Sequence, residues 1–178
     1  MKKILFLAAA LCLFSMAAFA QKSANFSGTW VLDASKSKPA ESMIESQTLV
    51  VTQTAADLKI ERTTTRKAGG TPTGGPPGGG GGRGGMMGGG DGTTTYTLDG
   101  KAVKSEMQGP GGAMSVTTTT TIDDKGLKIT RSVETPMGAR ESSEKWWLNA
   151  DGTLTVESTR PNRDGGTDTT TRTYTKKS

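Results

Sequence analysis

Short runs rich in threonine and other β-branched residues recur along this chain, separated by glycine, aspartate and asparagine. β-branched side chains are stiff in a helix but fit the pleated surface of a strand, and Gly, Asp and Asn favour turns. The pattern predicts an all-β protein with about ten antiparallel strands in meander order and no long helix. The expected strands are residues 26–33, 45–54, 58–67, 93–98, 101–107, 113–123, 127–134, 140–148, 153–159 and 167–175. Residues 34–43 are expected to be irregular, with room for a short helical turn.

The turn signals favour a closed, up-and-down barrel. Asp99-Gly100 lies between the fourth and fifth runs and predicts a hairpin there, because glycine accepts a positive φ. Closing the meander into a barrel would remove its exposed sheet edges. Residues 68–92 form a Gly/Pro-rich tract that cannot bury apolar surface, so we expect a disordered, surface-exposed loop inserted in a single domain of residues 21–178.

The strand faces change from apolar to polar along their length. Leu58 and Ile60 are followed by Arg62, and Ile129 is followed by Arg131, at the two-residue spacing of one strand face. Alternate connections of a meander lie at the same end, and the apolar residues lie beside the shorter turns. The sequence therefore predicts an apolar closed end and a polar mouth guarded by longer loops. The residues assigned to the closed end are Phe26, Gly28, Trp30 and Trp146.

The N-terminus has the features of a cleavable secretory signal peptide over residues 1–20. Lys2 and Lys3 precede the apolar residues 4–14, and Ala18 and Ala20 are the small residues that a signal peptidase reads. A membrane anchor and a lipid anchor on Cys12 are the alternatives, and both are less favoured by the pattern. We expect export to the periplasm or outside the cell, with no stable membrane insertion.

Removing the leader limits the available chemistry. The chain has no His and its one Cys lies in the leader, so Ser-His and Cys-His catalytic sites are excluded. Without the two leader lysines, 20 basic residues face 17 acidic ones, a net charge of +3 that does not suggest nucleic-acid binding. No carboxylate pair is marked out for catalysis or for a metal. We therefore expect neither an enzyme nor a cofactor or metal site, and the sequence identifies no protein partner.

Several short motifs resemble the calycin superfamily, which includes the lipocalins and fatty-acid-binding proteins. Residues 25–30, Asn-Phe-Ser-Gly-Thr-Trp, resemble its Gly-x-Trp opening strand, and residues 151–157 and 171–174 resemble the last strands of the fatty-acid-binding type. The chain after the leader also resembles secreted bacterial lipocalin-like proteins of unknown role, through Lys36-Ser37, the turn at residues 96–101 and the closing Tyr-x-Lys at residues 174–176. The resemblance implies a calycin-like barrel that binds a small molecule.

The same resemblance suggests an anion site. Arg172 and Tyr174 match the Arg-x-Tyr pair that holds a ligand carboxylate in fatty-acid-binding proteins, and Arg62 and Arg131 are further candidates on inward faces. The competing interpretation is that these arginines reach solvent at the rim or pair with Glu144. The expected function is binding, without catalysis, of a small amphipathic ligand, with an anionic one as the narrower hypothesis. The alternative is a secreted or envelope interaction protein with a filled barrel, and a cavity of about 300 Å³ or more would favour the ligand.

Overall fold

The computed structural model of the chain describes residues 23–39, 44–67, 91–109, 112–135, 138–162 and 164–177. These residues form ten strands and no helix, as the sequence predicted. The expected leader at residues 1–20 and residues 68–90 of the expected insertion lie outside them. The strands are β1 (Gly28–Lys38), β2 (Ile44–Gln53), β3 (Asp57–Arg66), β4 (Gly92–Thr97), β5 (Ala102–Gly109), β6 (Gly112–Ile122), β7 (Leu127–Thr135), β8 (Gly138–Leu148), β9 (Leu154–Pro161) and β10 (Thr167–Lys176).

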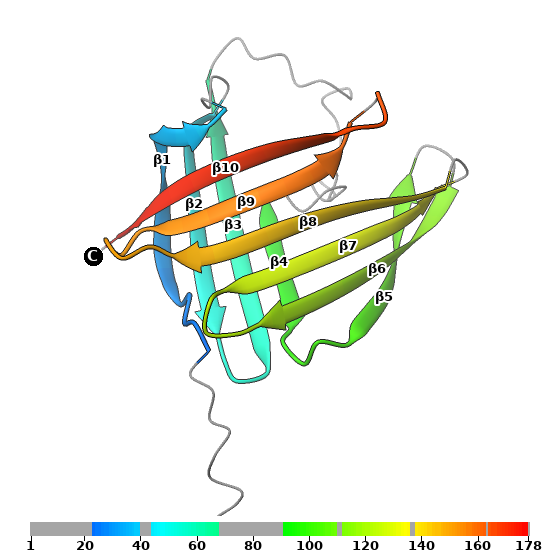
Figure 1. Cartoon of the computed structure of the whole chain (residues 1–178), viewed down its shortest axis with the longest axis horizontal. Helices are drawn as coiled ribbons and strands as arrows, with labels where there is room; N and C mark the ends of the chain where they lie inside the picture. The colour runs from blue at the N-terminus through cyan, green and yellow to red at the C-terminus, as the bar shows by residue number, and fades with distance from the viewer. Residues whose placement is uncertain are drawn as a thin grey trace, which may run out of the picture.

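The strands form one antiparallel meander sheet in the order β4-β3-β2-β1-β10-β9-β8-β7-β6-β5. The pairing of β1 with β10 joins β1 to β4 and β5 to β10 into this one sheet. The sheet is strongly curled, so that β6 to β10 cross in front of β2 and β3 (Figure 1). The two edges of the sheet are β4 and β5, which are consecutive in sequence but form no ladder in the described part of the chain. The prediction of a closed barrel was therefore wrong between β4 and β5. We call the gap between these two edge strands the seam.

The hairpin predicted at Asp99-Gly100 was wrong for the same reason. The turn itself forms: Gly100 has a φ of 73°, and the Lys101 N–H donates to Asp99 Oδ1 at 3.0 Å. However, the Leu98 N–H donates to the Ala56 carbonyl at 2.7 Å, which continues the pairing of β4 with β3 up to the turn. The strands leaving the turn diverge, because local turn chemistry does not require them to pair.

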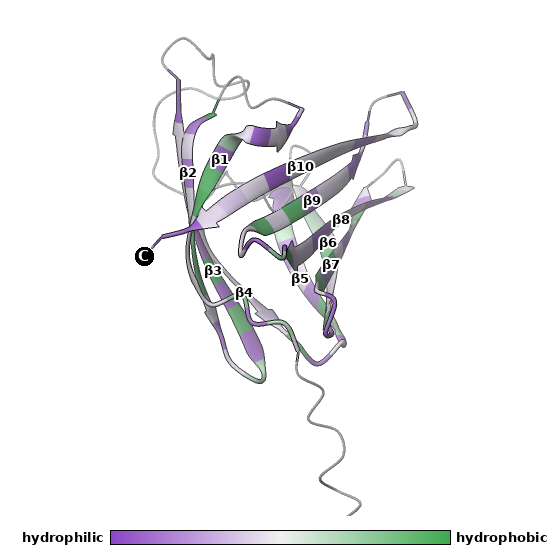
Figure 2. Ribbon diagram, turned by 60° about the vertical axis from the view of Figure 1, so that its left-hand side comes forward, coloured by the Kyte–Doolittle hydropathy of each residue, from purple (hydrophilic) through white to green (hydrophobic). Residues whose placement is uncertain are grey.

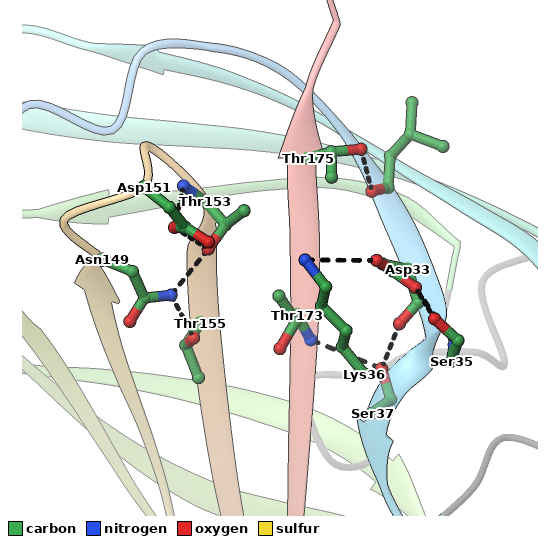
Figure 3. A network of polar contacts seen from close by, with 11 residues as sticks. Asp33, Ser35, Lys36, Ser37, Asn149, Asp151, Thr153, Thr155, Thr173 and Thr175 are labelled. Atoms are coloured by element: carbon green, nitrogen blue, oxygen red, sulfur yellow. Dashed lines mark hydrogen bonds and ion pairs between the residues drawn. The ribbon is translucent and has the colours of Figure 1, made fainter.

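The stretch expected to be irregular is instead a strand through residue 38, interrupted by a bulge. The pairing of β1 with β10 shifts register between Asp33 and Lys38. Ser37 Oγ donates to the Asp33 carbonyl at 2.9 Å and accepts from the Thr173 N–H at 3.4 Å, and Lys36 Nζ lies 3.8 Å from Asp33 Oδ2 (Figure 3). These contacts satisfy polar groups that the bulge removes from the ladder, so β1 keeps its place beside β10 without a helical turn in residues 34–38.

Two of the five connections at the polar end are shorter than any connection at the other end. β5 ends at Gly109 and β6 begins at Gly112, and β7 ends at Thr135 and β8 begins at Gly138, so two residues connect each pair. The expectation of a mouth guarded by long loops was wrong for these two connections.

No helix in the described part of the chain has the length and apolar character needed to cross a bilayer.

The core lies at the end predicted to be closed. Hydrophobic and hydrophilic residues alternate along the first half of β3 (Figure 2). The two-residue period puts Leu58 and Ile60 on one face of the strand, and both are buried. The Phe26 and Trp146 rings pack edge to face, with 6.0 Å between their centroids. Trp30 Nε1 donates a hydrogen bond to the Phe26 carbonyl at 2.8 Å. Gly28 has a φ of 140° and lies against Lys176, where a Cβ would come within 2.7 Å of Lys176 Cε. The core residues are Phe26, Trp30, Leu49, Val51, Leu58, Ile60, Tyr96, Leu127, Ile129, Trp146, Leu154, Val156 and Tyr174.

Candidate ligand site

Five strands contribute charged side chains to the polar half of the interior. Each charged residue continues the inward face of its strand beyond the apolar residues, at the two-residue spacing of a strand face. We name this set the arginine cluster, and it contains four guanidinium groups and one carboxylate. Its members are Arg62 on β3, Arg131 on β7, Glu144 on β8, Arg160 on β9 and Arg172 on β10.

Glu144 is the acidic member of the cluster. Its Oε2 lies 4.0 Å from Arg62 Nη2 and accepts a hydrogen bond from Trp146 Nε1 at 3.2 Å. The side chains of Arg62 and Glu144 are only 10% and 14% exposed, so this pair lies inside the barrel and not at a solvated rim. The interpretation that an arginine pairs with Glu144 is therefore correct for Arg62.

Tyr96 joins the cluster from β4, beside the seam. Its hydroxyl accepts a hydrogen bond from Arg131 Nη2 at 3.3 Å. Burial raises the pKa of the Tyr96 phenol, and the Glu144 charge raises it further, while Arg131 and Arg62 act in the opposite direction. Because the raised pKa keeps the phenol protonated near neutral pH, Tyr96 can accept from Arg131 and donate its own proton to a ligand oxygen.

Arg160 shows how strongly the positive charges act on one another. Burial lowers the pKa of its guanidinium, and the charges of Arg172, Arg62 and Arg131 lower it further. Glu144 is the group that acts in the opposite direction. Arg160 remains charged at neutral pH, since a guanidinium does not lose its proton in proteins. The cluster therefore has an excess of positive charge in a partly desolvated place.

A hollow of about 310 Å³ lies along the seam, between the edge of β4 and the inner face of β5 and β6. Val103, Met107 and Val116 provide an apolar wall, and Ser105 and Thr118 add hydroxyl groups. The hollow also contacts Tyr96 and Arg131. These two residues in turn line a small cavity of about 10 Å³ that reaches Glu144 and Arg160. The hollow and the small cavity at the arginine cluster therefore adjoin at Tyr96 and Arg131. Together they form a site that is apolar on one side and positively charged on the other.

The structure brings three of the four predicted ligand residues together in the arginine cluster, and of these only Arg131 lines the hollow. Arg62 and Arg131 take part in the contacts above, and the charge of Arg172 acts on Arg160. Tyr174, the fourth, is 1% exposed, and its hydroxyl donates to Gln47 Oε1 at 2.6 Å. Tyr174 thus packs in the apolar core and makes a structural hydrogen bond, and its predicted contact with a ligand stays a prediction.

Sequence reasoning missed Arg160 and Tyr96 as members of the site. Arg160 follows Val156 and Ser158 on one face, but the ninth strand was expected to end at residue 159. Tyr96 has the pattern of an ordinary core residue, and its partner Arg131 is 35 residues away in sequence. In the described residues, no group of three His, Cys, Asp or Glu side chains could hold a metal ion.

No family model matches the chain, and no curated protein matches its sequence. Among solved structures, the chain is similar to a point mutant of the fluorescent protein UnaG, with 15% identity and a TM-score of 0.51 over 86% of this chain and 96% of that one. It is also similar to wild-type UnaG, with 15% identity and a TM-score of 0.49 over 85% and 97% of the two chains. At such low identity the first match shows the fold alone, and it supports the calycin-like barrel architecture expected from the sequence.

Proposed function

We propose that this protein is an exported binding protein for a small, anionic, amphipathic ligand, and that it performs no catalysis. The observation that carries the proposal is that the seam hollow adjoins the arginine cluster, because Tyr96 and Arg131 line both the hollow and the small cavity. Binding sites for small molecules are mostly apolar hollows with a few convergent polar groups, and volumes start at about 300 Å³. A hollow of about 310 Å³ meets this criterion.

The division of the site gives each part of the ligand a place. An apolar tail would cover Val103 and Met107, which otherwise meet water through the open seam, and would contact Val116, which is already buried. An acidic headgroup would lie toward Arg131 and Tyr96, where a guanidinium fork matches a carboxylate or phosphate. The chain has no His, and its one Cys lies in the expected leader, so neither a Ser-His nor a Cys-His pair is available to act on the bound molecule.

The first test fills the hollow and leaves the arginine cluster intact. Ser105→Trp places a large side chain on the inner face of β5, and Lys104→Trp places the same side chain on the adjacent outer face. Displacement of a fluorescent amphipathic anion such as anilinonaphthalene sulfonate measures binding to each. We expect Ser105→Trp to lose at least about tenfold in affinity, or 1.4 kcal/mol, and Lys104→Trp to bind as the unchanged protein does. Equal binding by both variants would reject the hollow as the site.

Mass spectrometry of the protein isolated from its own cells tests the native ligand and the export together. The mature chain should begin at Gln21 if the leader is cleaved after Ala20. A small acidic, amphipathic molecule should be retained in the native spectrum and be lost from Ser105→Trp. If the protein carries no such molecule and binds no amphipathic anion in solution, the alternative of an interaction protein with a filled barrel becomes the better explanation.

A further inference from the structure

We propose that the headgroup of the ligand carries two negative charges, as a phosphate monoester or a pair of neighbouring carboxylates does. This inference rests on the proposed binding function and narrows the class of ligand. It comes from the charge balance of the arginine cluster and from the way that the hollow meets it.

The cluster contains four positive groups and one negative group. Arg62, Arg131, Arg160 and Arg172 face Glu144 alone within this set, which leaves a net charge of +3. Three further charged residues, Arg66, Arg140 and Asp168, continue the inward faces of β3, β8 and β10 toward the mouth. All three are exposed, so solvent screens their net charge of +1. A monoanion would leave +2 in the cluster, whereas a dianion leaves +1.

The excess charge is held where solvent screens it poorly. Arg62 is 10% exposed, and Arg160 lies in a place where burial and three neighbouring guanidinium groups all disfavour its charge. Partly buried charges are stable when they are paired, and each additional negative charge from a ligand relieves the repulsion among the arginines. A dianionic headgroup should therefore bind more tightly than a monoanionic one. A site with a single arginine would not give this difference, because one negative charge already balances it.

The geometry provides enough donors for several headgroup oxygens. Arg131 borders both the hollow and the small cavity, and Tyr96 beside it is a protonated phenol that can donate. Arg160 lines the small cavity, which has room for about one water-sized group such as a single headgroup oxygen. Thr118 and Ser105 supply hydroxyl groups on the hollow side. Three or more oxygens, as in a phosphate or a malonate, can use this donor set fully.

The test compares headgroups of different charge on one short apolar tail. Octyl phosphate and octyl sulfate share a tetrahedral shape, but above pH 7 the phosphate is mostly a dianion and the sulfate is a monoanion, because the second phosphate pKa is about 6. Octylmalonate provides two carboxylates and distinguishes paired carboxylates from phosphate. Calorimetry at pH 8 should give octyl phosphate or octylmalonate an affinity at least about tenfold above that of octyl sulfate. The advantage of octyl phosphate should shrink as the pH falls below 6.

Two variants and one control test the charge count directly. Arg160→Gln lowers the net charge of the arginine cluster to +2 and should reduce the preference for the dianion at least threefold. Glu144→Gln raises the net charge to +4 and should increase that preference. Lys128→Gln removes a positive charge from the exposed outer face of β7 and should leave the preference unchanged. Circular dichroism and thermal melting of each variant check folding, and Glu144→Gln keeps the test valid if Arg160→Gln does not fold.

The outcomes separate this inference from the proposed function. If octyl sulfate binds as tightly as octyl phosphate and octylmalonate, the protein binds amphipathic anions but the dianion inference is overturned. If a dianion preference exists but Lys128→Gln changes it as much as Arg160→Gln does, the preference comes from overall charge and the cluster is not its cause. If none of the three ligands binds, the proposed function itself fails.

Discussion

The hydrogen bond between Tyr174 and Gln47 provides a sharp test of the packing inside the barrel. Tyr174 Oη donates to Gln47 Oε1 at 2.6 Å, and Gln47 Nε2 donates to Thr64 Oγ1 at 2.9 Å. Tyr174 and Gln47 are 1% and 2% exposed, so water cannot replace either partner without a rearrangement. Tyr174→Phe removes the donor, keeps the ring in the core and leaves a buried amide oxygen without this hydrogen bond.

The expected cost follows from that unsatisfied oxygen. A buried polar group that loses its partner costs about 1–3 kcal/mol, more than the net value of the bond itself. Tyr174→Phe should therefore lower the free energy of unfolding by about 2 kcal/mol. In the double variant Tyr174→Phe with Gln47→Leu both polar partners are absent, so its cost should fall below the sum of the two single costs by at least about 0.5 kcal/mol.

Urea denaturation followed by tryptophan fluorescence measures these changes. With a urea m-value of about 1–3 kcal/mol/M for a small domain, a loss of 2 kcal/mol lowers the midpoint by roughly 1 M. Thr52→Val, on the exposed face of β2, is the control and should change stability by less than about 0.5 kcal/mol. A Tyr174→Phe midpoint equal to that of the control, or strictly additive costs in the double variant, would show that this hydrogen bond does not stabilise the fold.

Two further predictions concern the core and a turn. Leu154 and Leu148 are partners across the β8–β9 ladder, but Leu154 is 0% and Leu148 is 40% exposed, so Leu154→Ala should cost about 2–5 kcal/mol in thermal or urea unfolding and Leu148→Ala much less. Hydrogen bonds from the Thr153 hydroxyl and N–H lower the pKa of Asp151, so NMR titration should find its carboxyl titrating below 3.8, and Thr153→Ala should move it upward. Because the folded-state pKa is the lower one, this group stabilises the fold above the unfolded pKa, and the contribution disappears as the pH falls through the folded pKa.

The sequence predicted the strands and their faces well because both are local properties. The alternation of apolar and polar residues decides which side chains face inward, and Arg62, Arg131 and Arg172 all lie on the faces that the period of two assigns to them. Turn residues likewise placed the strand ends to within two residues for nine of the ten strands. The bulge in β1 was not predicted, because it depends on the hydrogen bond that Ser37 Oγ accepts from the Thr173 N–H, and Thr173 is 136 residues away in sequence.

The open seam and the composition of the site could not be predicted from the sequence, because both depend on how the whole sheet is arranged. A Gly turn at residue 100 is compatible with paired or divergent strands, and which of them forms depends on how ten strands coil together. Arg160 was missed through an error of two residues in the end of β9. A small boundary error of this kind leaves the fold prediction intact but hides a member of the site.

The charged half of the interior provides a physical reason for the open seam. If β4 paired with β5, the sheet would close over four guanidinium groups and one carboxylate, and burial of that unbalanced charge would oppose folding. The seam leaves Arg131 at the edge of a solvent-accessible hollow, so water can reach the cluster through it while the apolar half keeps the fold together. Because the core and the cluster occupy opposite halves of the same strands, the stability of this barrel does not require its polar half to be filled. The protein can therefore retain a charged hollow, which is where the proposed anionic ligand would bind.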